Sequence, residues 1–267
     1  MAEVFVTGQW FHYARLPEHD KQLYMQIYNA LKQRKSDVTF PVYAHEGAYP
    51  SEERILEIFL HVIWDHPCMY FIDGTNLSMC CETVHQGKIR MRYTEYFDPQ
   101  LSKQVEQVLR MRTDAILEQL PLQADTYTKL CCLYRCLIAN VRYMDDITPR
   151  NSLKNLEART IVGPLLNHLG VCAGYTKTFK LLCDQLNIGC FYIRGMALGE
   201  YGWANHGWNV VYLDGKFYHV DVTFEVTGGT SENAATWLYF LKSDSSMQKN
   251  HRWDGSYFPV ILEDYSK

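Results

Sequence analysis

The dipeptide Asp214-Gly215, which lies between two runs of apolar, β-branched and aromatic residues, is the strongest constraint that this sequence places on its fold. A two-residue Asp-Gly connection predicts a β-hairpin, with its two strands within residues 203–224. If the loop consists of these two residues, Leu213 lies opposite Lys216, and this one pair fixes the register of the hairpin. The chain must therefore fold around at least one antiparallel pair of strands.

The predicted register brings two polar side chains to the same face of the hairpin. Trp208 lies opposite Asp221 and His206 lies opposite Thr223, and side chains alternate between the faces of a strand. His206 and Asp221 thus become diagonal neighbours with Cα atoms about 7–8 Å apart, a separation that their side chains can bridge. His219 shares this face and is a second candidate histidine, which we rank lower because it lies beside Asp221 in the sequence.

Residues 171–187 form the second informative segment, a predicted helix. Apolar side chains recur at helical spacing on one face, at Tyr175, Phe179, Leu182, Cys183 and Leu186. Asn187 and Gly189 supply the stop signal, and Gly170 precedes the start. Cys172 therefore lies in the first turn, where unpaired N–H groups and the positive end of the helix dipole favour a thiolate and can stabilise an oxyanion.

Cys172, His206 and Asp221 are the three residue types that thiol-based nucleophilic catalysis needs. We expect Cys172 to be the nucleophile, and His206 to accept its proton and later to protonate a leaving amine. Asp221 would fix the orientation of the imidazole. Each residue taken singly could instead have a purely structural role. Most free cysteines are small buried hydrophobic residues, and a single histidine or aspartate often has its hydrogen bonds satisfied within the core.

Three motifs resemble the core of the transglutaminase-like superfamily: Gly-Val-Cys-Ala-Gly-Tyr at 170–175, His-Gly-Trp-Asn at 206–209 and Asp-Gly-Lys-Phe-Tyr-His-Val-Asp-Val-Thr at 214–223. Their order and separation also match, and the closer likeness is to uncharacterised bacterial members. The resemblance implies a papain-like α+β fold, in which the helix of the nucleophile packs on an antiparallel sheet. It implies a nucleophile, a base and an orienting acid at Cys172, His206 and Asp221.

The resemblance covers residues 125–255 and is strongest over 165–225. Shorter stretches at 66–71, 237–244 and 251–254 also resemble parts of the bacterial proteins. The calcium-binding regions and flanking β-domains of animal transglutaminases have no clear counterpart, so no calcium dependence is implied. The superfamily includes peptide-cleaving and inactive members, so membership leaves the reaction open.

These observations predict an enzyme that attacks a peptide or glutamine carboxamide carbonyl with Cys172 and forms a thioester acyl-enzyme. An amine acceptor would make it a transglutaminase, and water would make it a cysteine peptidase or amidase; the partner is a peptide or protein substrate. A catalytically inactive peptide-binding module is the alternative from another class of function. Tyr201 and Trp203 are candidates for the wall of the cleft, with ordinary core packing as the alternative.

Bulk composition argues against several other functions. The formal net charge is −4 and no run of Lys and Arg occurs, so binding to nucleic acid has no electrostatic basis. No apolar run approaches the roughly 20 residues that span a membrane, and the start of the chain lacks the pattern of a secretory signal. We therefore expect a cytoplasmic protein that does not bind a membrane, unless a signal has been removed from its N-terminus. The sequence does not indicate an oligomeric state.

The chain has 9 cysteines, several of them adjacent, which suits a reducing compartment better than a disulfide framework. Cys131, Cys132 and Cys136 fall within a predicted helix at 124–141, and no Cys-x-x-Cys pair occurs. We expect these three cysteines, and Cys80-Cys81 on a predicted strand, to pack in the core rather than to bind zinc. No metal site and no cofactor is predicted.

We expect an α+β fold with two regions, an N-terminal α+β extension at 1–122 and a catalytic domain at 123–267. In the extension, the sequence predicts helices at 17–34, 50–65 and 99–119, strands at 68–73, 77–85 and 88–96, and turns at Asp73-Gly74 and Gln86-Gly87. Residues 143–165 are predicted to be a loop that leads to Cys172. The extension either shapes the access of the substrate or only stabilises the core.

Overall fold

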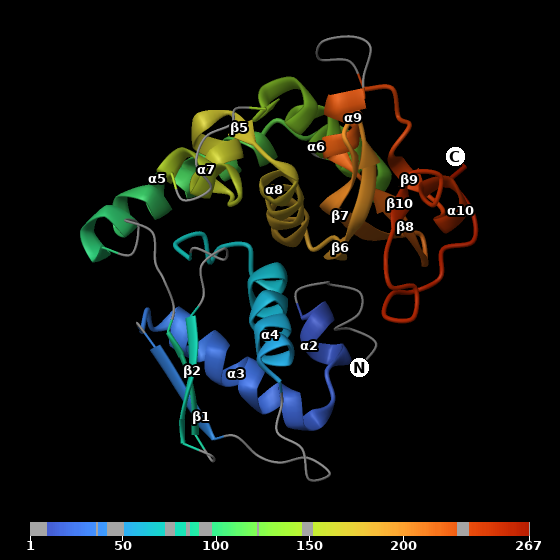
Figure 1. Cartoon of the computed structure of the whole chain (residues 1–267). Helices are drawn as coiled ribbons and strands as arrows, with labels where there is room; N and C mark the ends of the chain where they lie inside the picture. Colours follow the sequence, from blue (N-terminus) through green and yellow to red (C-terminus); the bar gives the residue numbers. More distant parts are fainter. Residues whose placement is uncertain are drawn as a thin grey trace.

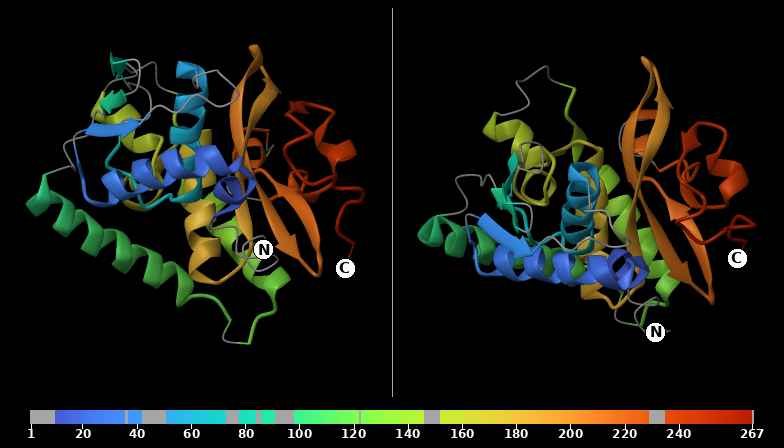
Figure 2. Two further views of the ribbon diagram at one scale, coloured as in Figure 1. Left: turned by 90° about the horizontal axis from the view of Figure 1, so that it is seen from below. Right: turned by 60° about the horizontal axis from the view of Figure 1, so that its bottom comes forward.

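A curved antiparallel sheet divides the molecule (Figure 1). The computed structural model describes residues 10–35, 37–41, 51–72, 78–83, 86–90, 98–121, 123–145, 152–228 and 235–266. Helices pack on one side of the sheet, and the C-terminal segment packs on the other, as the two views of Figure 2 show. This arrangement confirms the predicted α+β class.

The sheet has five strands in the order β10-β6-β7-β8-β9, and every neighbouring pair is antiparallel. Their bounds are β6 Cys190–Gly199, β7 Gly202–Leu213, β8 Lys216–Val220, β9 Phe240–Lys242 and β10 His251–Arg252. Strand β6, which the sequence analysis did not assign, pairs with β7 along its whole length. The longest strands therefore form a continuous platform beside the helix that carries Cys172.

The predicted hairpin is confirmed at its turn and is wrong at its end. Leu213 pairs with Lys216, and Asp214 and Gly215 have φ angles of 50° and 83°, as a type I′ turn requires. The second strand ends at Val220, whereas we expected it to reach residue 224. Asp221 instead begins helix α9 (Val222–Gly228), because its carboxylate accepts a hydrogen bond from the Phe224 N–H at 3.1 Å.

Helix α8 (Cys172–Gln185) lies in the centre of the molecule and confirms the prediction for 171–187. Tyr175, Phe179, Leu182 and Cys183 are buried on its predicted apolar face. This face packs on β6, β7 and helix α6 (Thr126–Asn140). The burial of this stripe fixes the position of the first turn, and therefore of Cys172, against the sheet.

The predicted helices of the N-terminal region are confirmed as α3 (Glu18–Lys32), α4 (Glu52–Asp65) and α5 (Pro99–Leu117). Ser51 caps α4 by accepting a hydrogen bond from the Arg54 N–H. A short helix α2 (Phe11–Arg15) precedes them. Strands β1 (Asp37–Pro41), β2 (Ser78–Thr83) and β3 (Gln86–Arg90) form a separate antiparallel sheet in the order β1-β3-β2.

Three predictions about secondary structure are wrong: the strand at 68–73, the turn at Gln86-Gly87 and the loop at 143–165. A strand is predicted for residues 68–73, but within the described part of this segment, residues 68–72, the chain forms turns. Met69 to Ile72 are all buried, so the apolar run reflects burial of consecutive side chains and not a strand. Gln86 and Gly87 belong to β3 instead of a turn, whereas Asp73-Gly74 lies outside the described residues.

The predicted loop 143–165 also contains regular structure. Helix α7 (Leu153–Ala158) and a π-helical turn η2 (Gly163–Asn167) lie within or at the end of it. Strand β4 (Arg142–Tyr143) pairs in parallel with β5 (Leu169–Gly170) directly before Cys172. These elements are too short to show a periodicity in the sequence. The last helix, α10, is Asp244–Met247.

The N-terminal region packs directly on the sheet. The Phe11 ring stacks on Phe191 with ring centroids 3.6 Å apart, and Trp64 stacks on Tyr192 at 5.2 Å. The His12 imidazole bonds the Tyr192 carbonyl at 3.1 Å and the Tyr257 hydroxyl at 3.2 Å. The boundary near residue 122 stays a prediction. Within the described residues, no helix is long and apolar enough to cross a membrane.

The buried histidine His61 on α4 gives this interface a dependence on pH. Its ring stacks on His12 at 4.7 Å, and its Nδ1 has no hydrogen-bond partner within the described residues. Burial lowers the pKa of His61 to about 3, so the unfolded chain binds a proton near pH 6.5 that the folded protein does not bind. Stability that this residue contributes above pH 6.5 is therefore lost as the pH falls toward 3.

Replacing His61 with phenylalanine should remove this loss. From pH 7 to pH 5, the free energy of unfolding of the wild type should fall by about 2 kcal/mol more than that of His61→Phe. Urea denaturation at both pH values measures the difference. His19→Phe, at an exposed site, is the matched control for the replacement of a histidine by phenylalanine. Parallel pH profiles for wild type and His61→Phe would contradict the prediction.

Candidate active site

Cys172 is the first residue of helix α8, as the sequence predicts. Val171 is the N-cap and offers no side chain to the helix, so the first N–H groups are not capped internally. Among the hydrogen bonds of the described residues, the backbone N–H groups of Cys172 and Ala173 have no acceptor. They are therefore available to an oxyanion that forms beside the sulfur.

The Cys172 thiol lies against strand β7. The His206 imidazole and the Gly207 backbone N–H are the groups beside the sulfur that favour its ionised form. Burial by itself raises the pKa of the thiol, but the bond and positive charge of His206, together with the Gly207 N–H, outweigh burial and lower it. The site thus favours a thiolate paired with an imidazolium.

His206 lies between the sulfur and a carboxylate. Its Nε2 is 2.6 Å from Asp221 Oδ2, so Nδ1 is the nitrogen that remains for the thiol. Burial lowers the pKa of His206, but the charge and hydrogen bond of Asp221 and the contact with Cys172 raise it to about 10. Cys172, His206 and Asp221 therefore form one chain of contacts, with His206 in the middle.

Asp221 reaches His206 from a position that differs from the predicted one. We expected both residues within paired strands, but Asp221 stands just beyond the end of β8, at the start of α9. Its carboxylate accepts from His206 at 2.6 Å, from His251 at 2.9 Å and from the Phe224 N–H at 3.1 Å. Burial raises the pKa of Asp221, but its bonds to the two histidines outweigh burial and lower it, so the group stays ionised.

Gly207 is positioned by contacts with Thr176 and Tyr192. Its carbonyl accepts from Thr176 on α8 at 2.8 Å, and Tyr192 covers the place that a Cβ would occupy, with the hydroxyl oxygen 2.1 Å from that point. Because Trp64 stacks on Tyr192, a side chain of α4 supports the strand residue whose N–H helps to lower the pKa of the Cys172 thiol. This support could not be predicted, since stacking between distant segments leaves no local pattern in the sequence.

His219, the competing histidine, belongs to a different cluster. Its Nδ1 accepts from the Trp208 indole at 3.0 Å, and its Nε2 lies 2.9 Å from Asp244. Burial lowers its pKa. The candidates for a cleft wall lie at the surface: Tyr201 is 96% exposed, and Arg252 covers the ring of Trp203 at 4.5 Å. A contact of Tyr201 or Trp203 with substrate stays a prediction.

His251 is a further residue of the site that was not predicted. It lies in the stretch 251–254 that resembles the bacterial proteins, but no spacing in the sequence links it to the other residues of the site. One ligand atom each from His206, Asp221 and His251 lies within 4.8 Å of the others, which makes them the candidate metal cluster of the described residues. The contacts of Asp221 with His206 at 2.6 Å and with His251 at 2.9 Å are hydrogen-bond distances, so protons already join these three side chains.

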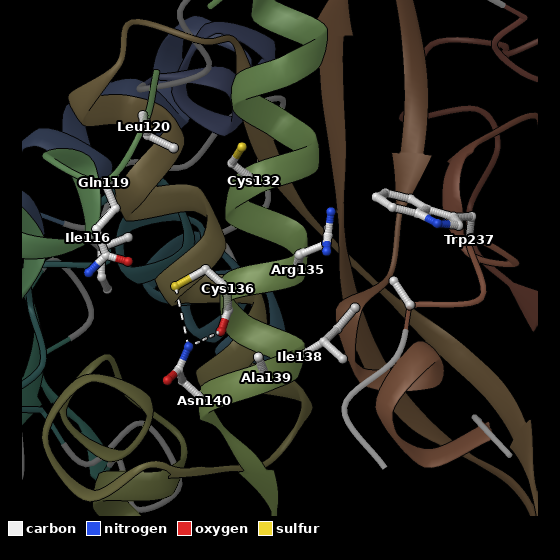
Figure 3. Close-up of a pocket in the computed structure, with 11 residues that line it drawn as sticks. Ile116, Gln119, Leu120, Cys132, Arg135, Cys136, Ile138, Ala139, Asn140 and Trp237 are labelled. Carbon is white, nitrogen blue, oxygen red and sulfur yellow. Dashed lines mark hydrogen bonds between the residues drawn. The ribbon is translucent and has the colours of Figure 1, made fainter. Parts of the chain in front are cut away.

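A large cavity of about 670 Å³ lies elsewhere, beside helix α6 (Figure 3). Cys132 and Cys136 line it, so the expectation that they pack in the core is wrong, because both stand on the helix face that points away from the core. Figure 3 shows that Asn140 approaches Cys136, with its amide 2.8 Å from the Cys136 carbonyl. None of the three proposed catalytic residues lines this cavity.

Comparisons with known proteins found a matching family model and similar solved structures. Residues 115–222 match the family model described as "Transglutaminase-like superfamily". A "Putative Cysteine Protease from Cytophaga hutchinsonii" is 13% identical, with a TM-score of 0.35, over 55% of this chain and 61% of that chain. "Crystal structure of a TGase" is 11% identical, with a TM-score of 0.41, over 71% of this chain and 50% of that chain. No curated protein matches the chain significantly.

Proposed function

We propose, from the premise that residues 115–222 contain a core of the transglutaminase-like superfamily, that this chain is a cysteine enzyme acting on peptide or glutamine carboxamide carbonyls. The observation that carries the proposal is the chain of contacts from Cys172 through His206 to Asp221. Cys172 is the nucleophile, His206 is the acid and base, and Asp221 orients and stabilises the imidazolium.

The reaction begins with the thiolate of Cys172. The sulfur adds to the carbonyl carbon, and the oxyanion that forms accepts hydrogen bonds from the unpaired N–H groups at the start of α8. When the tetrahedral intermediate collapses, the C–N bond breaks and His206 donates its Nδ1 proton to the leaving amine or ammonia. The acyl group then remains on the sulfur as a thioester.

The second half of the reaction restores the enzyme. An acceptor amine or water loses a proton to His206 and attacks the thioester carbonyl, and the C–S bond breaks to release the thiolate. With an amine the chain is a transglutaminase; with water it is a peptidase or amidase. The acceptor depends on how well the bound substrate excludes water from the thioester. A peptide-binding module without activity is the alternative, and it requires that the thiol be unreactive.

Trapping of the thioester tests the proposal. The protein is incubated with a library of glutamine-containing peptides, quenched in acid and examined by intact-protein mass spectrometry. We expect a covalent acyl adduct at Cys172 that disappears in Cys172→Ala and persists in Cys183→Ala, which removes a buried thiol remote from the contact chain. Addition of a primary amine should convert the adduct to a conjugate if the chain is a transglutaminase. Absence of any adduct, together with an unreactive thiol, would favour the binding module.

A further inference from the structure

His251 extends the contact chain beyond Asp221. It lies on β10, at the edge of the sheet, and its side chain is fully buried. Its Nε2 lies 2.9 Å from Asp221 Oδ2, the same oxygen that His206 bonds at 2.6 Å. One carboxylate oxygen therefore receives hydrogen bonds from two imidazoles, and each of these nitrogens must carry its proton to donate.

The other ring nitrogen of His251 also faces an oxygen. Nδ1 lies 2.7 Å from the side-chain oxygen of Asn250, and the amide nitrogen of Asn250 donates to the Tyr239 hydroxyl at 2.7 Å. A neutral imidazole has one donor and one acceptor nitrogen, whereas a doubly protonated ring has two donors. The acceptors on both sides of His251 therefore match the imidazolium form.

Asp221 is the anion that can balance a positive charge on His251. The rings of Phe224, Trp208 and Tyr239 surround it at centroid distances of 4.6, 4.9 and 5.8 Å. The other titratable groups that face it are His206, His219 and the Tyr239 hydroxyl. His219 accepts from Trp208 and so is neutral. A buried cation needs a paired, hydrogen-bonded anion, and Asp221 supplies it.

We propose that His251 is a second imidazolium bound to Asp221 and a positioning residue for the reaction, an inference that rests on the proposed function of Cys172. The four side chains then alternate in charge: thiolate at Cys172, imidazolium at His206, carboxylate at Asp221 and imidazolium at His251. Their charges sum to zero within a buried cluster. His251 does not touch the reacting atoms; it holds the carboxylate that orients His206.

The second cation has a measurable consequence for the pH range of the enzyme. A positive charge on His251 stabilises the Cys172 thiolate and disfavours the His206 imidazolium, so it lowers the pKa of both groups. The pKa of the thiol sets the acidic limit of the pH range in which the ion pair exists, and the pKa of His206 sets the alkaline limit. Removal of the charge should therefore shift both limits to higher pH. A residue with only a structural role would lower the rate without moving the two limits together.

The test measures alkylation of Cys172 by iodoacetate between pH 4 and 10. This anionic reagent needs the thiolate and is attracted by the neighbouring imidazolium, so its rate reports both limits. In His251→Gln, which keeps a neutral donor, we expect both limits to rise by about 0.5–1 pH unit. His219→Gln, which alters a buried histidine outside the contact chain, is the matched control and should leave both limits in place. Ring ¹⁵N NMR of the wild type at pH 7 should find both nitrogens of His251 protonated.

The outcomes separate this inference from the proposed function. If Cys172 of the wild type reacts no faster than a free thiol near neutral pH, the proposed function fails first. If Cys172 of the wild type is activated but the two pH limits of its alkylation are the same in His251→Gln, the inference that His251 is an imidazolium is wrong. Should His251→Gln fail to fold, the NMR measurement decides alone: a singly protonated ring at residue 251 overturns the inference, and a doubly protonated ring supports it.

Discussion

Replacing His206 with glutamine should lower the rate at which iodoacetamide alkylates Cys172 at pH 6 by up to about 10³-fold. The thiolate is the reactive form, and a cysteine thiol with its ordinary pKa of 9.0 is only about one part in 10³ thiolate at that pH. In the wild type, the hydrogen bond and charge of His206 offset the burial that otherwise raises the thiol's pKa. Without the imidazole, burial raises the pKa of the Cys172 thiol and His206 no longer opposes that rise.

The pH dependence distinguishes this effect from a general loss of structure. The difference between wild type and His206→Gln should narrow as the pH rises toward 10, because the unpaired thiol then ionises by itself. His219→Gln, in a buried cluster outside the contact chain, should react at the wild-type rate. Equal alkylation rates of wild type and His206→Gln at pH 6 would refute the activated thiolate.

Asp221→Asn should lower kcat/KM toward the trapped acyl donor by about 10³–10⁴-fold, the range seen when the acid of a catalytic triad becomes an amide. The carboxylate accepts from His206, His251 and the Phe224 N–H. An asparagine side chain has one acceptor oxygen, so its NH₂ group must face a donor or force a histidine to lose its proton. His206 then loses both the charge that stabilises its imidazolium and the bond that orients it.

Two measurements show that this loss arises at the site. Asparagine is a good N-cap, so α9 should keep its start, and circular dichroism should find the variant folded at the assay temperature even though loss of the buried carboxylate lowers its stability. Asp244→Asn, which alters the carboxylate beside His219 in a comparable His–Asp pair, should retain most of the activity. A kcat/KM near the wild-type value in Asp221→Asn would contradict the proposed role of Asp221 in the reaction.

Much of the candidate site could be predicted from short-range chemistry. The Asp-Gly turn fixed the register of the hairpin because positive φ angles at both positions favour these residues. The apolar spacing of α8 located Cys172 in its first turn. The prediction that His206 and Asp221 are neighbours is correct, although Asp221 lies one residue beyond the paired part of β8. The end of β8 still places the carboxylate beside the same face of β7.

The parts that failed depend on contacts between distant segments or on elements too short for a pattern. Strand β6 was missed although it is ten residues long, because it is buried on both faces near its start and does not alternate there. The π-helical turn before Cys172 has no periodic signature. The positions of Cys132 and Cys136 on the cavity face of α6 followed from the packing of the other helices.

The sequence by itself determined the nucleophile's helix, the turn of the hairpin and the three residue types of the proposed mechanism, because local propensity and turn geometry act over a few residues. Only the tertiary structure decided that Trp64 supports Tyr192 over Gly207, and that His251 shares the carboxylate oxygen of Asp221 with His206. These contacts join segments that meet only when the sheet is assembled and the apolar faces of α4 and α8 are buried on it. Burial then turns ordinary hydrogen bonds between those segments into large shifts of pKa, which no spacing in the chain encodes.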